Sequence, residues 1–137
     1  MNRLGGCTLR IMHISNTYKP YRGGVVSSIA AQRMALEAAG HQTCLVTLDF
    51  GHDDIDPTVY KIPTIAKWDY KKNVMAIPLF AREFLLSRIV SYRPHLIHIH
   101  HPFLLGPLAV KLAKRFSIPT VFTYHTRYQE YSHYIPL

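Results

Sequence analysis

Short apolar runs alternate with longer amphipathic stretches along most of the chain. A short apolar run bounded by turn-forming residues is typical of a strand in a buried sheet. Such runs predict strands at 9–15, 43–48, 59–62, 96–100 and 120–124. The segments between most of these runs are long enough for the crossover connections that parallel strands require.

An alanine-rich stretch without glycine or proline predicts a helix at 25–39, and the helical spacing of apolar residues predicts helices at 79–92 and 108–116. The first ends before Gly40, a residue suited to the left-handed position just past a helix. The second begins after Pro78 and ends before Pro94. The third follows a turn at 102–107, carries its apolar side chains on one face and ends in basic residues that suit the helix dipole.

The alternation of strands and helices indicates a parallel sheet with helices on both faces. The predicted fold class is α/β, a Rossmann-like three-layer αβα arrangement with a mostly parallel sheet. We expect residues 9–137 to form one such domain and residues 1–8 to be a flexible leader. Because ligands of these sheets bind beyond the carboxyl ends of the strands, we expect a site at 16–24, 100–106 and 125–131.

Composition and charge narrow the class of protein. With 137 residues, of which 48% are hydrophobic and 18% charged, the chain is long enough for one domain and too short for two. The formal net charge of +8 favours anionic partners, but there is no nucleic-acid module, so nucleic acid is not an expected partner. No apolar stretch reaches the ~20 residues of a membrane-spanning helix. Two cysteines are too few for a disulfide framework and favour a reducing cytoplasm.

Two adjacent glycines, Gly23 and Gly24, stand directly before the first predicted helix. Without side chains they let a phosphate or a sugar approach the backbone, where a helix offers N–H groups and its positive dipole end. A plain turn would also explain them, because glycine is common where a chain bends sharply. The first crossover has neither the Gly-x-Gly-x-x-Gly fingerprint nor a P-loop, which argues against ordinary NAD binding and P-loop chemistry.

Histidines gather near the ends of the later predicted strands. His98 and His100 share one strand face and could chelate a metal ion, so a zinc hydrolase is one alternative function. Packed, hydrogen-bonded histidines are the competing interpretation, because no carboxylate or cysteine accompanies the pair. His100 and His101 stand where a strand opens into its loop, where a ligand contact and a structural role are both open.

His125 directly follows an apolar strand. Its neighbours Thr123, Thr126 and Arg127 can all donate hydrogen bonds to an oxygen-rich ligand. By position alone, His125 could serve either a ligand or the packing of the domain.

Cations stand beside aromatic rings in the middle of the chain, at Lys61, Lys67, Trp68, Tyr70, Lys71 and Lys72. Proteins that rest on anionic membrane surfaces use this mixture. A solvated basic loop is the simpler interpretation, because a cluster of charges does not by itself require a partner.

Several motifs, in order along the chain, resemble the opening half of a family 4 retaining glycosyltransferase. They are IMHISN at 11–16, YKP at 18–20, GGV at 23–25, LEAAGH at 36–41, RPHLIHIH at 93–100 and TYHT at 123–126. The segment YHTRYQEY at 124–131 is most similar to the members that transfer a hexose to diacylglycerol.

The resemblance implies the N-terminal half of a GT-B fold, in which two Rossmann-like halves face each other across a cleft. The chain would be incomplete at its C-terminus, and the C-terminal donor domain would be absent. That domain would bind most of the nucleotide-diphosphate sugar, which we expect to be a UDP-sugar. No cofactor and no metal are expected, and we expect no turnover from the isolated chain.

The resemblance also assigns roles to individual residues. It implies that Gly23 and Gly24 approach the donor and that His125 is the catalytic residue that contacts the transferred sugar. This half would also bind most of the acceptor, a lipid such as diacylglycerol or a sugar, and the positions of the loops suggest Tyr18, His101 and Arg127 as the residues near it.

Expectations about partners and location follow. We expect a cytoplasmic protein with peripheral contact to an anionic membrane at its inner face, and self-association into a homo-oligomer. A nucleotide- or sugar-binding module without catalysis is the main alternative function.

Overall fold

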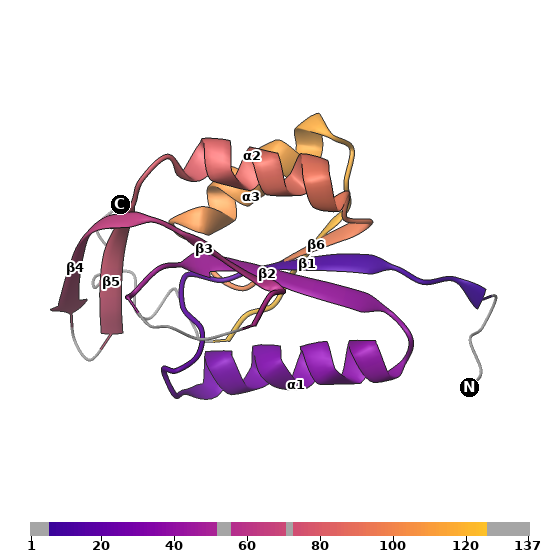
Figure 1. Ribbon diagram of the computed structural model, residues 1–137, viewed down its shortest axis with the longest axis horizontal. Coiled ribbons are helices and arrows are strands. Elements are labelled where there is room, and N and C mark those ends of the chain that lie inside the picture. The colour runs from indigo at the N-terminus through magenta and orange to yellow at the C-terminus, as the bar shows by residue number, and fades with distance from the viewer. Residues whose placement is uncertain (1–5, 52–55, 71–72, 126–137) are drawn as a thin grey trace.

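A parallel sheet forms the middle layer of the molecule. The computed structural model describes residues 6–51, 56–70 and 73–125. Within these ranges the strands of the sheet are, in spatial order, β3 (Val59–Ile62), β2 (Gln42–Leu48), β1 (Arg10–Ile14), β6 (Leu96–Ile99) and β7 (Thr120–Phe122). Helix α1 (Gly24–Ala38) covers one face, and helices α2 (Ala81–Tyr92) and α3 (Leu105–Arg115) cover the other (Figure 1). The predicted α/β class and Rossmann-like three-layer arrangement are confirmed.

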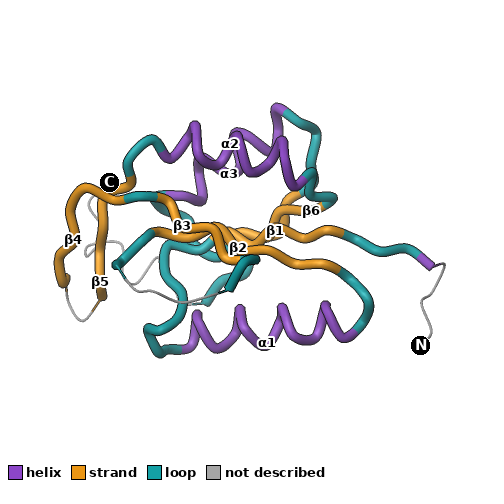
Figure 2. The backbone as a smooth tube through the Cα atoms, in the orientation of Figure 1, coloured by secondary structure: helices purple, strands orange, loops and turns teal. Residues whose placement is uncertain are grey.

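The strand order makes β1 a switch point of the sheet. From β1 the chain first adds β2 and β3 on one side, and it later adds β6 and β7 on the other, with every neighbouring pair parallel. The connections that leave β1 and β6 therefore run to opposite faces, through α1 and α3 (Figure 2). In open α/β sheets this divergence opens a crevice at the carboxyl ends of the two strands.

Hydrophobic side chains secure the sheet from both faces. Met12 of β1 packs in the larger core cluster together with Leu85 of α2 and Leu112 of α3. On the opposite face Leu45 of β2 packs in a smaller cluster with Ile29 of α1. Fully burying a side chain of this size stabilises a fold by roughly 1.5–3 kcal/mol. The carboxyl edge of the sheet is thus held by packed layers on both sides.

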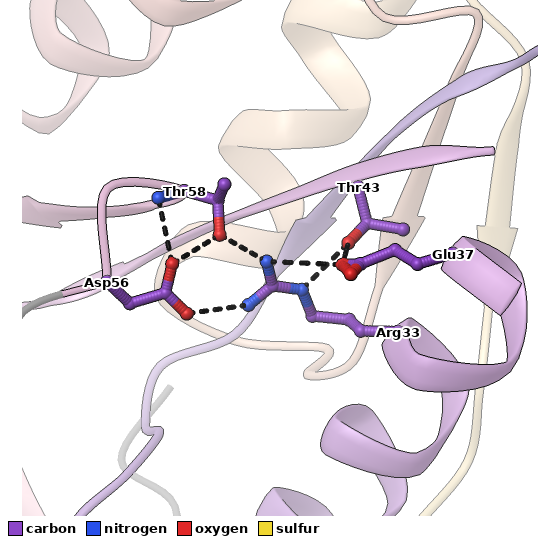
Figure 3. Close-up of polar contacts among 5 residues, drawn as sticks. All are labelled: Arg33, Glu37, Thr43, Asp56 and Thr58. Carbon is purple, nitrogen blue, oxygen red and sulfur yellow. Dashed lines mark hydrogen bonds and ion pairs between the residues drawn. The ribbon is translucent and has the colours of Figure 1, made fainter. Parts of the chain in front are cut away.

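A buried arginine joins α1 to the strands on its side of the sheet. Arg33 donates from Nε to Oγ1 of Thr43 at 2.9 Å and from Nη2 to Oγ1 of Thr58 (Figure 3). The carboxylates of Glu37 and Asp56 lie 3.8 and 3.9 Å from the guanidinium group. Both carboxylates are about half exposed, so water weakens these ion pairs and the hydrogen bonds carry most of the stabilisation.

A β-hairpin lies where the sequence suggested a solvated basic loop, so a loop is the wrong prediction for this segment, although residues 65–69 are exposed. Strands β4 (Thr64–Tyr70) and β5 (Asn73–Pro78) pair with each other in antiparallel fashion. Lys67 and Asp69 share one side of β4 and Trp68 takes the other, an alternation that the high polarity of the segment hides. The hairpin lies beyond the carboxyl edge of the central sheet (Figure 1).

Helix α3 and strand β7 differ from their predicted bounds. Helix α3 begins at Leu105 rather than at 108. Pro107 lies in its first turn, where the missing N–H of proline is not needed, so this residue does not interrupt the helix. Strand β7 ends at Phe122 rather than at 124. None of the helices in the described ranges has the length and apolar character needed to cross a membrane.

Candidate functional site at the carboxyl edge of the sheet

Loops that follow β1, β6 and β7 meet at the carboxyl edge of the sheet. The backbone N–H of Asn16, after β1, donates to Nδ1 of His101, after β6, at 3.2 Å. The side chain of Asn16 donates from Nδ2 to the carbonyl oxygen of Phe103 at 3.1 Å. His125 reaches the same edge from β7 and is hydrogen-bonded to His100. The structure therefore brings together residues from all three segments that the sequence assigned to a site.

Four histidines form what we call the histidine ladder: His13, His98, His100 and His125. His13 stands opposite His98 in the register of β1 and β6, and His100 shares the face of His98 because alternate residues point the same way. Nδ1 of His13 lies 2.9 Å from Nε2 of His100, and Nδ1 of His100 lies 2.9 Å from Nε2 of His125. Nε2 of His98 is hydrogen-bonded to Oγ1 of Thr123.

Burial keeps the rings of the ladder neutral near neutral pH. It lowers the pKa of His13 to about 3, with further contributions from the charges of His98 and Arg33. Burial and the neighbouring histidines lower the pKa of His100 to about 2. The pKa values of His98 and His125 are also lowered, in both cases mainly by burial. A neutral imidazole carries one N–H donor and one acceptor, so the ladder can relay hydrogen bonds without carrying charge.

Three histidines of the ladder lie close enough together to be considered as ligands of a metal ion. Ligand nitrogens of His13, His98 and His100 lie within 4.8 Å of one another. A metal ion is bound along the in-plane lone pair of each imidazole, yet the planes of His98 and His100 are only 18° apart and those of His13 and His100 only 23° apart. Stacked rings direct their lone pairs along similar planes and not toward one point. The arrangement favours hydrogen-bonded packing and gives no support to a zinc hydrolase.

Asn16 also connects the end of β1 to the start of α3. Its Oδ1 accepts a hydrogen bond at 3.2 Å from the backbone N–H of Leu105, the first residue of that helix. An oxygen in this position satisfies one of the N–H groups that a helix start leaves without a partner. A Cβ added at Gly106 would lie 2.0 Å from the carbonyl oxygen of His101. The glycine therefore allows α3 to begin directly against the loop that carries His100 and His101.

Gly23 and Gly24 lie at the start of α1, at the same edge of the sheet (Figure 1). Gly23 is the N-cap with φ of 151°, a conformation that residues with side chains rarely adopt. A Cβ added at either glycine would meet nothing within 4 Å, so the space beside them is open. Among the described residues no side chain caps the helix, so none of their side-chain oxygens occupies its first N–H groups.

The residues expected to bind the acceptor lie in different environments. Burial lowers the pKa of His101 to about 4, and its ring accepts the hydrogen bond from Asn16. Tyr18 is only 6% exposed and packs in the smaller core cluster, 6.0 Å from the guanidinium of Arg33. This position suits a packing role for the ring, and acceptor binding by Tyr18 stays a prediction. Arg127 lies outside the described residues.

His13 lies outside the segments that the sequence assigned to the site, whereas Asn16 and Gly106 lie within them but have no individual role in the sequence analysis. His13 is fully buried and forms the inner end of the ladder. Asn16 joins two loops, and Gly106 permits their close contact. A histidine inside an apolar strand was a visible signal for His13, but only the strand register brings it opposite His98.

The hairpin turns apolar side chains outward, and we call Trp68 and Ile77 the hairpin face. Ile77 pairs with Ala66, which puts it on the same side of the hairpin as Trp68, and the two are 44% and 43% exposed. Lys67 lies on the opposite side and donates from Nζ to the carbonyl oxygen of Phe50 at 3.1 Å. The amine of Lys67 is therefore bound to the body of the domain. Lys71 and Lys72 lie outside the described residues.

Comparison with known proteins relates this geometry to a family. Residues 22–137 match the model of Glycosyltransferase Family 4. This match includes the glycines at the start of α1 and the histidine that follows β7.

Individual relatives match over most of this chain. An alpha-monoglucosyldiacylglycerol synthase of Acholeplasma laidlawii is 33% identical over 129 residues, which cover 93% of this chain and 32% of that protein. A protein of the same name from Streptococcus pneumoniae is 31% identical over 130 residues, which cover 93% of this chain and 29% of that protein. A GDP-mannose-dependent alpha-mannosyltransferase of Mycobacterium tuberculosis is 25% identical over 130 residues, which cover 88% of this chain and 33% of that protein. The chain thus spans about a third of the length of these curated relatives.

Proposed function

Because the chain belongs to Glycosyltransferase Family 4, we propose that it provides the acceptor-binding half of an enzyme that transfers a hexose from a nucleotide-diphosphate sugar. The observation that carries the proposal is the family match over residues 22–137, which includes Gly23, Gly24 and His125. All three lie at the carboxyl edge of the sheet, where a ligand of this fold is expected.

The chemistry of the edge suits this transfer. The uncapped start of α1, with Gly23 and Gly24 leaving its backbone open, would face the diphosphate and stabilise the negative charge that develops as the sugar leaves. The imidazole of His125 would hold a hydroxyl of the transferred sugar and so fix the orientation of the reacting carbon. The anomeric configuration of the hexose would be retained. We expect a UDP-sugar as the donor.

A lipid such as diacylglycerol is the acceptor that the relatives favour. Two of them carry the name alpha-monoglucosyldiacylglycerol synthase. A lipid acceptor requires the site to approach a membrane, and the hairpin face of Trp68 and Ile77 supplies exposed apolar side chains beyond the same edge of the sheet. Peripheral contact with the anionic inner face of the cell membrane is therefore part of the proposal. His101, Tyr18 and Arg127 would bind the acceptor.

Transfer requires a second, donor-binding half under this proposal. The relatives are about three times as long as the stretch they share with this chain. The chain alone is expected to give no turnover.

Self-association is a further expectation. Sedimentation of the chain at high concentration would test it by comparing monomeric and dimeric boundaries.

A hybrid protein tests the proposal. In the hybrid this chain replaces the matching third of the Acholeplasma laidlawii synthase, and radiolabelled UDP-glucose is supplied with vesicles containing diacylglycerol. We expect a labelled glucosyl lipid with the anomeric configuration of the donor, and no product from the chain alone. A hybrid that melts cooperatively but forms no glycolipid from UDP-glucose, UDP-galactose or GDP-mannose would contradict the proposal. A ligand-dependent thermal shift of that inactive hybrid would favour the alternative of a binding module without catalysis.

A further inference from the structure

Three histidines form a continuous chain of hydrogen bonds from the core to the edge of the sheet. His13 and His100 are both fully buried, and His125 is partly exposed. Each of the two links joins an Nδ1 to an Nε2 at 2.9 Å. The chain therefore uses Nδ1 of His13, both ring nitrogens of His100 and Nε2 of His125.

Hydrogen bonds in this chain must all run in the same direction. A neutral imidazole has one N–H and one lone pair, so a ring that donates from one nitrogen accepts at the other. Near neutral pH these rings are neutral, because burial and the neighbouring His98, His101 and Arg33 disfavour the charged form. Either every ring donates outward toward His125, or every ring donates inward toward His13.

The buried end of this series of hydrogen bonds, at His13, decides between these directions. Nε2 of His13 is buried and has no hydrogen-bond partner in the described part of the structure. Inward donation would leave a buried N–H at this atom without an acceptor, whereas outward donation leaves only an unused lone pair. Buried N–H groups without partners are rarer in folded proteins than acceptors that are incompletely satisfied. The outward direction is therefore favoured.

We propose that His100 is a positioning residue that holds His125 as its Nδ1–H tautomer, with the direction set by His13 at the buried end. Nδ1–H of His100 donates to Nε2 of His125, so the remaining hydrogen-bonding group of His125 is a donor. In the part of the protein that the structure describes, no group accepts a hydrogen bond from this Nδ1–H of His125. The lone pair of His125 is already used, and this residue cannot act as a general base while the ladder is intact.

The consequence for transfer rests on the proposed function. A fixed N–H donor suits a hydroxyl oxygen of the donor sugar, which accepts hydrogen bonds, and it disfavours a role in removing a proton from the acceptor. His100 does not touch the sugar in this account. It acts only through His125.

Nitrogen NMR of the histidine rings tests the proposal directly on the 137-residue protein. Long-range ¹⁵N–¹H spectra at neutral pH distinguish a protonated from an unprotonated ring nitrogen, and we expect the Nδ1–H form for His13, His100 and His125. Observation of His125 as the Nε2–H tautomer, or as a charged ring, would overturn the proposal. The measurement uses no substrate, so its outcome is independent of the hybrid transfer assay, and either result can fail while the other stands.

An isosteric pair of variants separates positioning from packing. In His100→Asn the side-chain amide can still donate to Nε2 of His125, whereas His100→Leu has nearly the same shape and no donor. We expect His125 to remain the Nδ1–H tautomer in His100→Asn and to become a mixture of both tautomers in His100→Leu. An unchanged tautomer of His125 in a folded His100→Leu protein would also overturn the proposal. If neither variant folds, the wild-type spectrum still decides.

Discussion

Nδ1 of His13 and Nε2 of His100 face each other at 2.9 Å between two neighbouring parallel strands, both in fully buried side chains. A buried polar group is costly unless it is hydrogen-bonded, and here these two nitrogens satisfy each other. The pair joins the middle of the sheet to the edge where the glycines of α1 and His125 lie. Its properties lead to predictions about stability as well as about transfer.

Acidification is expected to destabilise the fold through the neutral histidines. The pKa values of His13, His100 and His101 are lowered to about 3, 2 and 4, below the 6.5 of an unperturbed histidine. Between pH 6.5 and these values the unfolded chain binds more protons, so the free energy of unfolding falls as the pH falls. The slope is about 1.4 kcal/mol per pH unit for each such histidine. Urea unfolding between about pH 7.5 and 4.5 measures it, and equal stability at both ends would contradict this account.

Asp56 acts in a lower pH window, which keeps the two effects separate. Partial burial would raise the pKa of this carboxyl group, but hydrogen bonds from Thr58 and the charge of Arg33 outweigh burial and hold the pKa below 3.8. Stability that depends on this carboxylate is present above that value and is lost only as the pH falls further. Replacing Asp56 with Asn is therefore expected to leave the slope between pH 6.5 and 4.5 unchanged.

Gly106→Ala is expected to destabilise the domain, and Gly24→Ala serves as its control. Both glycines lie in the first turn of a helix, but a Cβ at position 106 would lie 2.0 Å from the carbonyl oxygen of His101, whereas one at position 24 meets nothing within 4 Å. Forcing an atom into a packed site costs about 1–3 kcal/mol and sometimes more. Thermal unfolding should reveal a lower melting temperature for Gly106→Ala alone. Equal melting temperatures would contradict this expectation, because they would mean that the loop of His101 moves to accommodate the added Cβ without loss of stability.

Arg33→Met is expected to lower the free energy of unfolding by about 1–3 kcal/mol, the range for losing hydrogen bonds from a charged donor. Arg33 is 5% exposed and donates to Thr43 and Thr58, so its loss removes the link between α1 and the strands beneath it. Arg82 is exposed on α2, and Arg82→Met should change stability by less than about 0.5 kcal/mol. Chemical denaturation of both variants provides the comparison. Similar losses in the two would remove the case for a structural role of Arg33.

The hairpin face is expected to contribute to membrane binding. The double variant Trp68→Ser and Ile77→Ser should weaken binding to anionic vesicles by about fivefold or more, because two half-exposed apolar side chains lose their contact with the bilayer. Met34 is 74% exposed on α1, away from the hairpin, and Met34→Ser is the matched control. Vesicle sedimentation measures the bound fraction. Equal binding by the double variant and the wild type would exclude the hairpin as the contact.

Local patterns carried most of the fold. The apolar run at Val59–Ile62 matches β3 at both ends, and helix α1 ends at Ala38, shortly before Gly40 as expected. These elements could be predicted because the spacing of apolar residues within each segment is enough to indicate a strand or a helix. The hairpin could not, because its polar strands pair only with each other and one side rests on the domain through Lys67.

The site was predicted in part for a related reason. The position of His125 at the end of a strand can be identified in the chain itself, and so can the two glycines before α1. The links from His125 to His100 and from His100 to His13 depend on strand order and register, which join residues that are 25 and 87 positions apart. No local pattern contains that information. The roles of Tyr18, His101 and Arg127 stay predictions.

Hexose transfer by the hybrid with and without the imidazole of His125 tests the central claim most directly. His41 is the matched control, because it lies at the amino end of β2, where its ring accepts a hydrogen bond from the N–H of Leu9. We predict that His125→Ala lowers the turnover number by at least about tenfold, the loss expected for a hydrogen bond that orients the reacting sugar, and that turnover falls much more than stability does. His41→Ala should retain turnover within about twofold. Equal turnover in the two variants would contradict the assignment of His125 to the transferred sugar.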